Sequence, residues 1–506
     1  MDKTRKYFDL NREECLQRID DESCYDLNLD ELFTFVNHTH SSIGKQYLYN
    51  LLRHIPKKNK IKPYEPWLES HAKDSHLKEQ LSIILKKLEH RDVYDIYPLI
   101  EQDYIPYSRN KLYALQVLQF FPTLFLGIYL ISKIPLFLLL TFALFFVHAI
   151  IHYRAKTISF TYSGSMPQMY NMITAAQKLS AIAEIKLLCP GIEQSIRKVG
   201  PLKRKLSVFK LDVKLESDLA IIVWTLRELI KIFFLQDPLH LNKAFTLIRR
   251  DREELLNIFT FIGLTDTLQS IATLREVMPW YCLPRFTEEE TLAAEELYHP
   301  LIRDCVPNSF TLQQHSFLVL GSNMSGKTSF VRTIGVNVLL AQTIHTAFAH
   351  QIVLAPQKIL TSITIDDNLM EGQSFYLREV LRMKHILSET EEGHNLILLD
   401  ELFKGTNTIE RIAGAKALLE HLAANKKNII LAATHDIELI ELLSNRFTPI
   451  YFTENIEEGK LSFNYKINYT RNPQKNAIRI LELYGFPPEV ISDALSTAEE
   501  LPERFT

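Results

Sequence analysis

The sequence predicts a mixed fold: an all-α region interrupted by a helical hairpin long enough to cross a membrane, followed by an α/β domain. Three observations predict it. Glycine accounts for only 15 of 506 residues, less than half of the typical share of ~7%, which favours long helices. An apolar block occupies residues 112–151. From about residue 297 onward, short β-rich runs alternate with helical runs, as in a parallel sheet with crossover helices.

These changes in texture divide the chain into four parts. We assign residues 1–108 and 157–295 to the two halves of a helical core and lever region, 109–156 to the hairpin, and 296–506 to the α/β domain with its C-terminal helices. The hydrophobic share of 46% excludes a disordered chain, and the net charge of −3 gives no global argument for a nucleic-acid partner. The five cysteines form no C-x-x-C pair, which predicts a reducing compartment.

The apolar block predicts a membrane anchor. Its two runs, Leu112–Ile131 and Ile134–Ile151, are long enough at ~1.5 Å per residue to cross most of a ~30 Å hydrocarbon layer. Basic residues flank both outer ends, which places these ends in the cytoplasm by the positive-inside rule. We therefore expect a protein of the inner (cytoplasmic) membrane whose soluble domains face the cytoplasm, with no cleavable signal. The alternative is a buried core hairpin in a helical protein.

Two further segments of the helical region have a distinctive pattern. The run Leu219–Leu235 is apolar but is interrupted at helical spacing by charged residues, which predicts an amphipathic core helix. The window from Arg197 to Lys214 is basic and indicates contact with DNA phosphates or anionic lipid headgroups; the alternative is a solvated loop and helix face. Its candidate contact residues are Arg197, Lys198, Lys203, Arg204 and Lys205.

The strongest motif is a P-loop, G-x-x-x-x-G-K-[ST], at Gly321–Thr328. It follows an apolar strand and precedes a helical run, which is the context that the motif requires. Lys327 is expected to bridge the β- and γ-phosphates, and the Thr328 hydroxyl to coordinate Mg²⁺. The candidate nucleotide-binding residues are Gly321, Ser322, Asn323, Met324, Ser325, Gly326, Lys327, Thr328 and Ser329.

Three later elements complete a candidate site for nucleotide hydrolysis. An apolar strand ends in Asp400-Glu401, where Asp400 is expected to hold Mg²⁺ and Glu401 to orient or deprotonate the attacking water. His435 ends another strand and is expected to sense the γ-phosphate. Gly372 and Ser374 resemble the signature element of ABC-type ATPases, which completes the site of the opposite subunit; the alternative is an ordinary helix cap at Ser374.

Together these residues resemble the MutS family. The family's P-loop reads G-P-N-M-G-G-K-S, close to Gly321–Thr328, and the Asn-Met pair is more specific than the P-loop itself. The family's D-D-L-x-x-G-x-S-T-F-x-x-E is similar to Asp367–Glu379, its D-E-x-x-x-G-T-S-T to Asp400–Thr408, and its T-H to Thr434-His435. Weaker similarity covers Thr39–Leu48, in a Thr…Gly…Leu pattern.

The resemblance implies a P-loop, ABC-type ATPase that uses ATP and Mg²⁺, forms a homodimer through its ATP sites and couples ATP binding and hydrolysis to engagement of duplex, mismatched or branched DNA. The sequence has no counterpart of the family's mismatch-reading domain or its Phe-x-Glu wedge, and the soluble members lack the hairpin. We therefore expect a shortened, membrane-anchored member. The alternatives are a membrane-associated ABC-type mechanoenzyme with no nucleic-acid partner and a soluble protein whose hairpin is an oligomerisation core.

Overall fold

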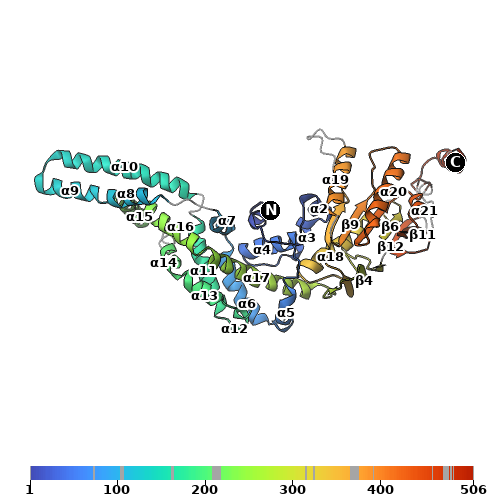
Figure 1. The fold of residues 1–506 in the computed structure, drawn as a ribbon, viewed down its shortest axis with the longest axis horizontal. Helices are drawn as coiled ribbons and strands as arrows, with labels where there is room; N and C mark the ends of the chain where they lie inside the picture. The colour runs from blue at the N-terminus through green and yellow to red at the C-terminus, as the bar shows by residue number, and fades with distance from the viewer. Residues whose placement is uncertain are drawn as a thin grey trace. The chain divides into compact units, whose positions relative to one another are not determined.

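The computed structural model groups the chain into two compact units. It describes residues 2–71, 74–102, 107–160, 164–207, 218–313, 316–322, 325–364, 375–390, 393–457, 460–470, 478, 481–482 and 484–504. The first unit comprises Met1–Arg12, Asn37–Asn50 and Tyr64–Thr273, and the second comprises Glu13–Val36, Leu51–Pro63 and Leu274–Thr506. The helix-rich first half and the sheets of the C-terminal part confirm a mixed fold (Figure 1).

The first unit is helical in its described residues. Its main helices are α1 (Asp2–Leu10), α4 (Ser42–Arg53), α5 (Glu65–His71), α6 (Ser75–Leu85), α7 (Ile96–Glu101), α8 (Arg109–Leu118), α9 (Phe121–Ser132), α10 (Pro135–Phe160), α11 (Ser165–Ser180), α12 (Ala183–Lys186), α13 (Ile192–Lys198), α14 (Gly200–Leu206), α15 (Asp218–Phe233), α16 (Gln236–Arg250) and α17 (Arg252–Val277). The last residues of α4 and α17 belong to the second unit.

Three stretches among the described residues are long and apolar enough to cross a membrane: Asn110–Ser132, Pro135–Arg154 and Arg252–Val277. The third, α17, is a core helix, because 83% of its most apolar window is buried. The first two are the predicted hairpin, and only 11% and 17% of their windows are buried. Lys133, in the left-handed conformation at φ 58°, ends α9 and turns the chain into α10 (Figure 1). By length and composition, the hairpin is thus a candidate membrane element.

Buried Asp266 holds the core helix α17 to the start of α4. Its carboxylate accepts hydrogen bonds from the backbone N–H of His40 (2.9 Å), the backbone N–H of Ser41 (2.8 Å) and the Ser41 hydroxyl (2.5 Å). A Cβ at Gly44 would collide with this carboxylate, so the position requires glycine. The Thr…Gly…Leu pattern of the sequence therefore marks the place where α4 meets a buried acid.

The second unit contains two larger sheets. The strands are β1 (Gln17–Arg18), β2 (His54–Ile55), β3 (Arg285–Phe286), β4 (Thr291–Leu297), β5 (Asn308–Gln313), β6 (Ser316–Gly321), β7 (Gln351–Leu354), β8 (Lys358–Ser362), β9 (Asn395–Asp400), β10 (Asn428–Thr434), β11 (Phe447–Glu457) and β12 (Lys460–Asn468). One sheet has the order β12-β11-β6-β10-β9-β8, in which β12 alone is antiparallel to its neighbour. The other has the order β3-β7-β4-β5.

Helices cover the six-stranded sheet, which explains its continuous apolar strands. They include α18 (Lys327–Thr343), α19 (Phe375–Glu389), α20 (Thr408–Ala424) and α21 (Leu439–Leu442); α2 (Asp21–Asp26), α3 (Leu29–Val36) and α23 (Pro488–Arg504) also belong to this unit. The edge strand β8 is protected by side chains from the N-terminal segment. The Gln17 amide pairs with both the N–H and the C=O of Ile359, and Asp26 accepts from Thr361 and the following backbone.

We predict that Asp266→Ala lowers the free energy of unfolding of the helical unit by about 3 kcal/mol, because buried donors lose their acceptor. Hydrogen exchange of the α4 and α17 amides in the detergent-solubilised protein measures this change. Glu184→Ala, at an exposed position of α12, is the matched control and should leave exchange unchanged. Equal protection in both variants would contradict the assigned role of Asp266.

Burial also raises the pKa of Asp266 to about 6, from 3.8 in the unfolded chain. The folded state therefore holds this proton more tightly than the unfolded state between these two values. The contribution of Asp266 to stability should fall as the pH rises from about 4 to about 6, and Asp266→Asn should remove that slope.

Candidate functional site

The P-loop lies between the end of β6 and the start of α18, as the sequence predicts. Gly321, at φ +154°, and Gly326, at φ +103°, both adopt backbone conformations that side chains disfavour. A Cβ on Gly321 would come within 2.6 Å of the Phe452 carbonyl oxygen, so the loop closes tightly on the neighbouring strand. Gly326 is the N-cap of α18, whose N-terminus faces the loop. Asn323 and Met324 lie outside the described residues.

The Lys327 side chain folds back onto the P-loop. Its Nζ donates to the carbonyl oxygens of Gly321 (2.7 Å) and Ser322 (2.8 Å) and lies 3.5 Å from Nε2 of His435. The side chain is buried, at 4% exposure. Ser325 adds a hydrogen bond from its hydroxyl to the Ser322 carbonyl, at 2.8 Å. The loop therefore holds one ammonium group at the point where the motif places phosphate oxygens.

Thr328 and Asp400 meet at the carboxyl edge of the sheet. The Thr328 hydroxyl donates to Oδ2 of Asp400 at 2.5 Å. Oδ1 of Asp400 is buried and has no hydrogen-bond partner within the described part of the chain. Burial raises the pKa of Asp400, and the hydrogen bond from Thr328 opposes that rise. A hydroxyl beside a carboxylate with one unpaired buried oxygen fits the hard oxygen ligands that Mg²⁺ prefers.

Glu401 is placed between a histidine and a lysine side chain. Its carboxylate lies 2.7 Å from Nε2 of His435 and 2.8 Å from Nζ of Lys404. The hydrogen bond from His435 lowers the pKa of Glu401 to about 2, against the opposing effect of burial, and Lys404 contributes further. The residue is left-handed, at φ 51°, and its N–H donates to the Ala433 carbonyl at 2.8 Å. Glu401 is thus an ionised carboxylate held against β10.

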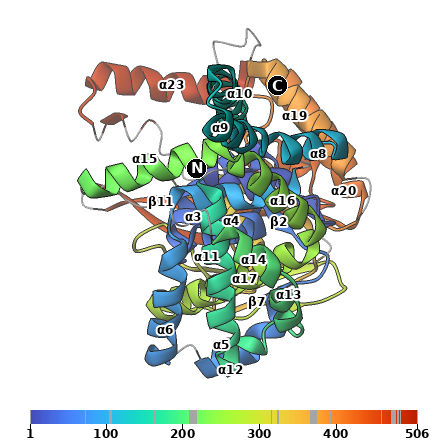
Figure 2. The same cartoon turned by 90° about the vertical axis from the view of Figure 1, so that its left-hand side faces the viewer.

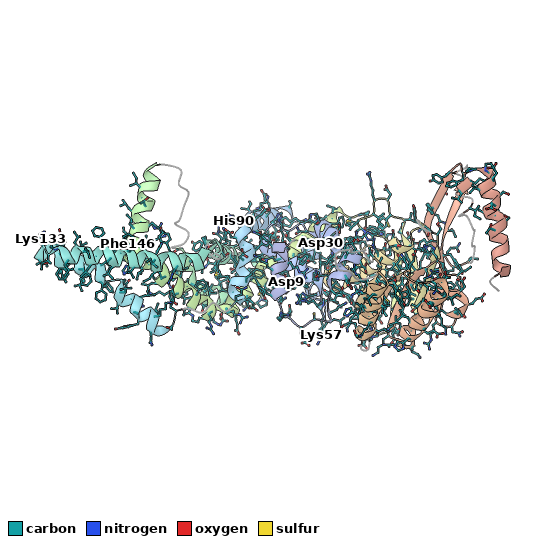
Figure 3. The ribbon with its side chains drawn as sticks, turned by 90° about the horizontal axis from the view of Figure 1, so that it is seen from above. Asp9, Asp30, Lys57, His90, Lys133 and Phe146 are labelled. Carbon is teal, nitrogen blue, oxygen red and sulfur yellow. The ribbon has the colours of Figure 1, made fainter. Side chains whose placement is uncertain are left out.

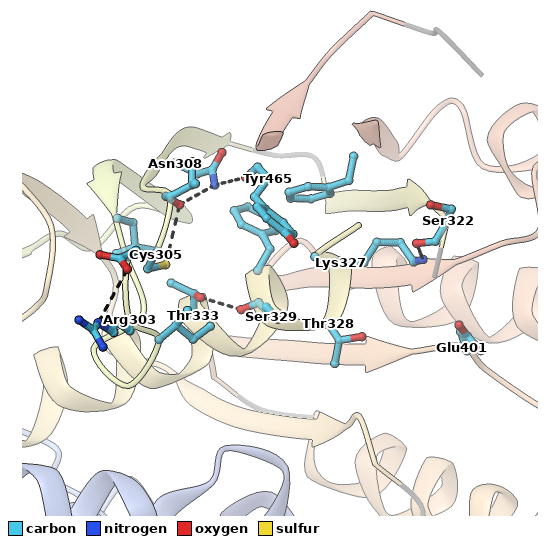
Figure 4. Close-up of a pocket in the computed structure, with 17 residues that line it drawn as sticks. Arg303, Cys305, Asn308, Ser322, Lys327, Thr328, Ser329, Thr333, Glu401 and Tyr465 are labelled. Atoms are coloured by element: carbon cyan, nitrogen blue, oxygen red, sulfur yellow. Dashed lines mark hydrogen bonds and ion pairs between the residues drawn. The ribbon is translucent and has the colours of Figure 1, made fainter. Parts of the chain in front are cut away.

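A cavity of about 480 Å³ adjoins these groups. Figure 4 shows Lys327, Thr328 and Glu401 on one side and Asn308 and Tyr465 on the other. Tyr465 packs against Gly326, where a Cβ would lie 3.0 Å from its ring, and its carbonyl accepts from the Asn308 amide at 2.9 Å. The volume is in the range of small-molecule sites. The cavity is lined by Leu297, Ile302, Arg303, Asp304, Cys305, Val306, Asn308, Ser322, Gly326, Lys327, Thr328, Ser329, Phe330, Thr333, Glu401, Phe452 and Tyr465.

Two side chains hold the loops that follow Glu401 and precede α21, and the sequence analysis assigned this role to neither of them. Arg411 of α20 forms a two-point ion pair with Asp436, at 2.6 and 3.0 Å, directly after His435. Glu379, whose pKa is raised by burial, accepts from the backbone N–H of Lys404 (3.3 Å) and Gly405 (3.4 Å). The signals in the sequence were the acid that follows His435, the lysine three residues after Glu401, and Glu379 itself, which matches the last residue of the MutS motif at Asp367–Glu379.

Other predicted residues lie elsewhere. Gly372 and Ser374 are outside the described residues. The basic residues belong to the first unit: Arg197 and Lys198 end α13, and Lys203, Arg204 and Lys205 lie on α14. Lys198 pairs with Glu254 at 2.6 Å, and Lys203 donates to the Gln177 side chain at 2.5 Å. Arg197, Lys198, Arg204 and Lys205 are all exposed, so these four of the predicted contact residues are accessible.

Comparison with known proteins agrees with this geometry. Residues 317–502 match the model of MutS domain V. This match begins in β6 and covers the P-loop, the acidic pair and His435. These residues form a domain V of the MutS family. It is 32% identical over 278 residues to the DNA mismatch repair protein MutS of Aquifex pyrophilus, covering 51% of this chain and 32% of that protein.

Two further MutS relatives give the same picture. The DNA mismatch repair protein MutS of Oceanobacillus iheyensis is 30% identical over 253 residues, which cover 48% of this chain and 29% of that protein. The protein of the same name from Staphylococcus aureus MRSA252 is 28% identical over 258 residues, 49% of this chain and 29% of its own length. The similarity to MutS therefore spans about a third of the relatives' length.

We predict that Arg411→Ala lowers the kcat of ATP hydrolysis by about tenfold while nucleotide affinity changes little, because the loop that carries His435 loses its anchor. Steady-state hydrolysis and equilibrium binding of a fluorescent nucleotide separate the two effects. Lys416→Ala removes an exposed ion pair with Glu420 on the same helix and is the matched control. Loss of binding in proportion to rate would contradict a positioning role.

Proposed function

We propose that the chain is a membrane-anchored, MutS-like ATPase that dimerises through its ATP sites and couples ATP binding and hydrolysis to engagement of DNA. One observation carries the ATPase part. Lys327, Thr328 and Glu401 line one cavity at the carboxyl ends of the parallel strands, while Asp400 contacts Thr328 and His435 contacts Glu401. Ligands of open α/β sheets bind at the carboxyl ends of the strands.

Each group has a chemical task in this proposal. Thr328 and Asp400 would hold Mg²⁺, which would supply charge neutralisation at the phosphate oxygens. Lys327 exchanges its loop carbonyls for β- and γ-phosphate oxygens. Glu401, ionised at neutral pH, orients the attacking water and accepts its proton, while His435 lies between that carboxylate and the Lys327 ammonium group. Preorganised charge of this kind is the main source of rate in phosphoryl transfer.

The quaternary and membrane parts rest on other observations. Gly372 and Ser374 complete the partner subunit's ATP site, as the family resemblance implies, so that ATP stabilises the dimer and hydrolysis releases it. The hairpin anchors the protein in the inner membrane, since its two apolar windows are only 11% and 17% buried. Arg204 and Lys205 offer exposed positive charge to DNA phosphates.

We predict that Lys327→Ala abolishes tight ATP binding, because the phosphates lose their ammonium partner. Glu401→Gln should retain binding and slow hydrolysis by about 100-fold, since the amide cannot accept the proton of the water. Binding isotherms and phosphate release measure these effects. The matched control is Glu441→Gln at an exposed position of α21. Hydrolysis by Glu401→Gln at the unmodified rate would refute the assigned role.

The DNA part is tested by measuring ATPase activity in lipid nanodiscs with and without duplex, mismatched and four-way-junction DNA, together with gel shifts at two salt concentrations. We expect binding that weakens as salt rises, and weaker binding by a double Arg204→Glu, Lys205→Glu variant. No binding at low salt would refute DNA engagement. Activity that rises with lipid and ignores DNA would instead support the mechanoenzyme without a nucleic-acid partner.

A further inference from the structure

Helix α15 in the first unit is packed the opposite way round from a water-soluble amphipathic helix. Its apolar side chains Ile222, Val223, Leu226, Leu229 and Ile230 are 44–59% exposed. Two of its charged residues, Glu228 and Lys231, are buried, at 7% and 8% exposure, and Arg227 is partly buried. The sequence predicted a core helix here, and this is wrong for the apolar face. A helix in water buries its apolar stripe instead.

The polar edge of α15 packs against α10 of the hairpin. Nε2 of His152, which is fully buried, lies 3.1 Å from Oε1 of Glu228, and Nζ of Lys231 lies 3.6 Å from Oε2 of the same carboxylate. One turn earlier on α10, Nδ1 of His148 lies 2.9 Å from the Phe233 carbonyl oxygen. Ionisable residues that face a helical interface while apolar residues face outward are typical of membrane bundles.

The crossing point of α15 matches the depth of a membrane surface. Figures 2 and 3 show α15 lying crosswise to the hairpin arm formed by α9 and α10. From the turn at Lys133 to Arg154, the next positively charged side chain along α10, the helix rises roughly 30 Å, the thickness of a hydrocarbon layer. His148 and His152 lie roughly 20–30 Å from the same turn. Helix α15 thus crosses α10 near the open end of this uncharged stretch.

The exposed apolar face of α15 has the same character as the surface of the hairpin. Large exposed apolar residues of α9 and α10 include Leu124, Leu130, Ile131, Leu136, Leu139, Phe142, Phe146, Val147 and Ile150. Between α10 and α15 in the sequence, α14 ends with the exposed basic residues Arg204 and Lys205. An apolar helix face and basic residues in the same region of the chain are the composition of helices that bind anionic membranes.

We propose that α15 lies along the membrane surface and inserts its apolar face among the lipid acyl chains at the base of the hairpin. This inference rests on the proposed membrane anchoring by α9 and α10 and adds a third membrane-contacting helix to it. The His152–Glu228–Lys231 cluster then fixes α15 across α10, within protein rather than within lipid. Interfacial helices bury their apolar faces ~5–10 Å below the headgroups, which agrees with the crossing point.

The test uses the full-length protein in nanodiscs that contain phosphatidylglycerol. A fluorescent amino acid is introduced by codon suppression at one position at a time, and its quenching is measured with phospholipids that carry a nitroxide either near the headgroup or deep in the acyl chain. Leu226 and Ile230 report on α15. Phe142, about 13 Å from the turn along α10, reports on the middle of the hairpin. Leu187, which is 79% exposed outside both elements, is the matched control.

The expected result is that the shallow nitroxide quenches the α15 positions about twofold more than the deep one, with the reverse at Phe142 and no quenching at Leu187. Quenching at Phe142 but not at Leu226 or Ile230 would overturn the α15 proposal and leave the hairpin anchor standing. No quenching at any position would overturn the anchor itself. Protection of Leu226 from aqueous iodide without quenching by either lipid would show a second protein copy on α15 and also overturn the proposal.

Discussion

Parallel pairing of β6 with β10, and of β10 with β9, brings the groups of the candidate site to one edge of the sheet. The register places Thr434 beside Leu320 and Asp400 beside Ala433, so the P-loop, Glu401 and His435 leave their strands side by side. A slip of one residue would turn every buried side chain to the other face. The same apolar strands that stabilise the sheet therefore fix the distances between the P-loop, the Thr328–Asp400 pair and Glu401.

Two adjacent carboxylates at this edge have opposite pKa shifts, and their surroundings explain the difference. Asp400 is buried with one hydroxyl as its partner, which raises its pKa; Glu401 turns through a left-handed backbone toward His435 and Lys404, which lowers its pKa to about 2. Environments that separate the pKa values of neighbouring acids are a mark of divided chemical roles. Asp400 is suited to gain a cation, whereas Glu401 already has its charge balanced.

Motif spacing was sufficient to predict the P-loop, the acidic pair and the histidine, because phosphate chemistry restricts those residue types to strand ends. The supporting contacts could not be predicted. Arg411 is an ordinary charged residue in the sequence, Glu379 matches a family motif that does not state its contacts, and the roles of both depend on which loops they reach. Asp266 and Ser41 are 225 positions apart, so the collision that requires glycine at position 44 exists only after folding. Likewise, residues 13–36 and 51–63 group with the second unit, although their sequence pattern is helical like that of the first unit.

Helix α15 shows a further limit of prediction from the sequence, and this limit has a physical cause. An amphipathic pattern gives the period of a helix but not which face is packed, since either face satisfies the same periodicity. Leaving a large apolar side chain in water costs roughly 1.5–3 kcal/mol relative to burial, whereas an exposed ion pair contributes about 0–1 kcal/mol. Five exposed apolar residues against one buried polar cluster therefore make an arrangement that water disfavours. It becomes favourable when the surroundings of α15 are themselves apolar, as they are at the boundary of a lipid bilayer.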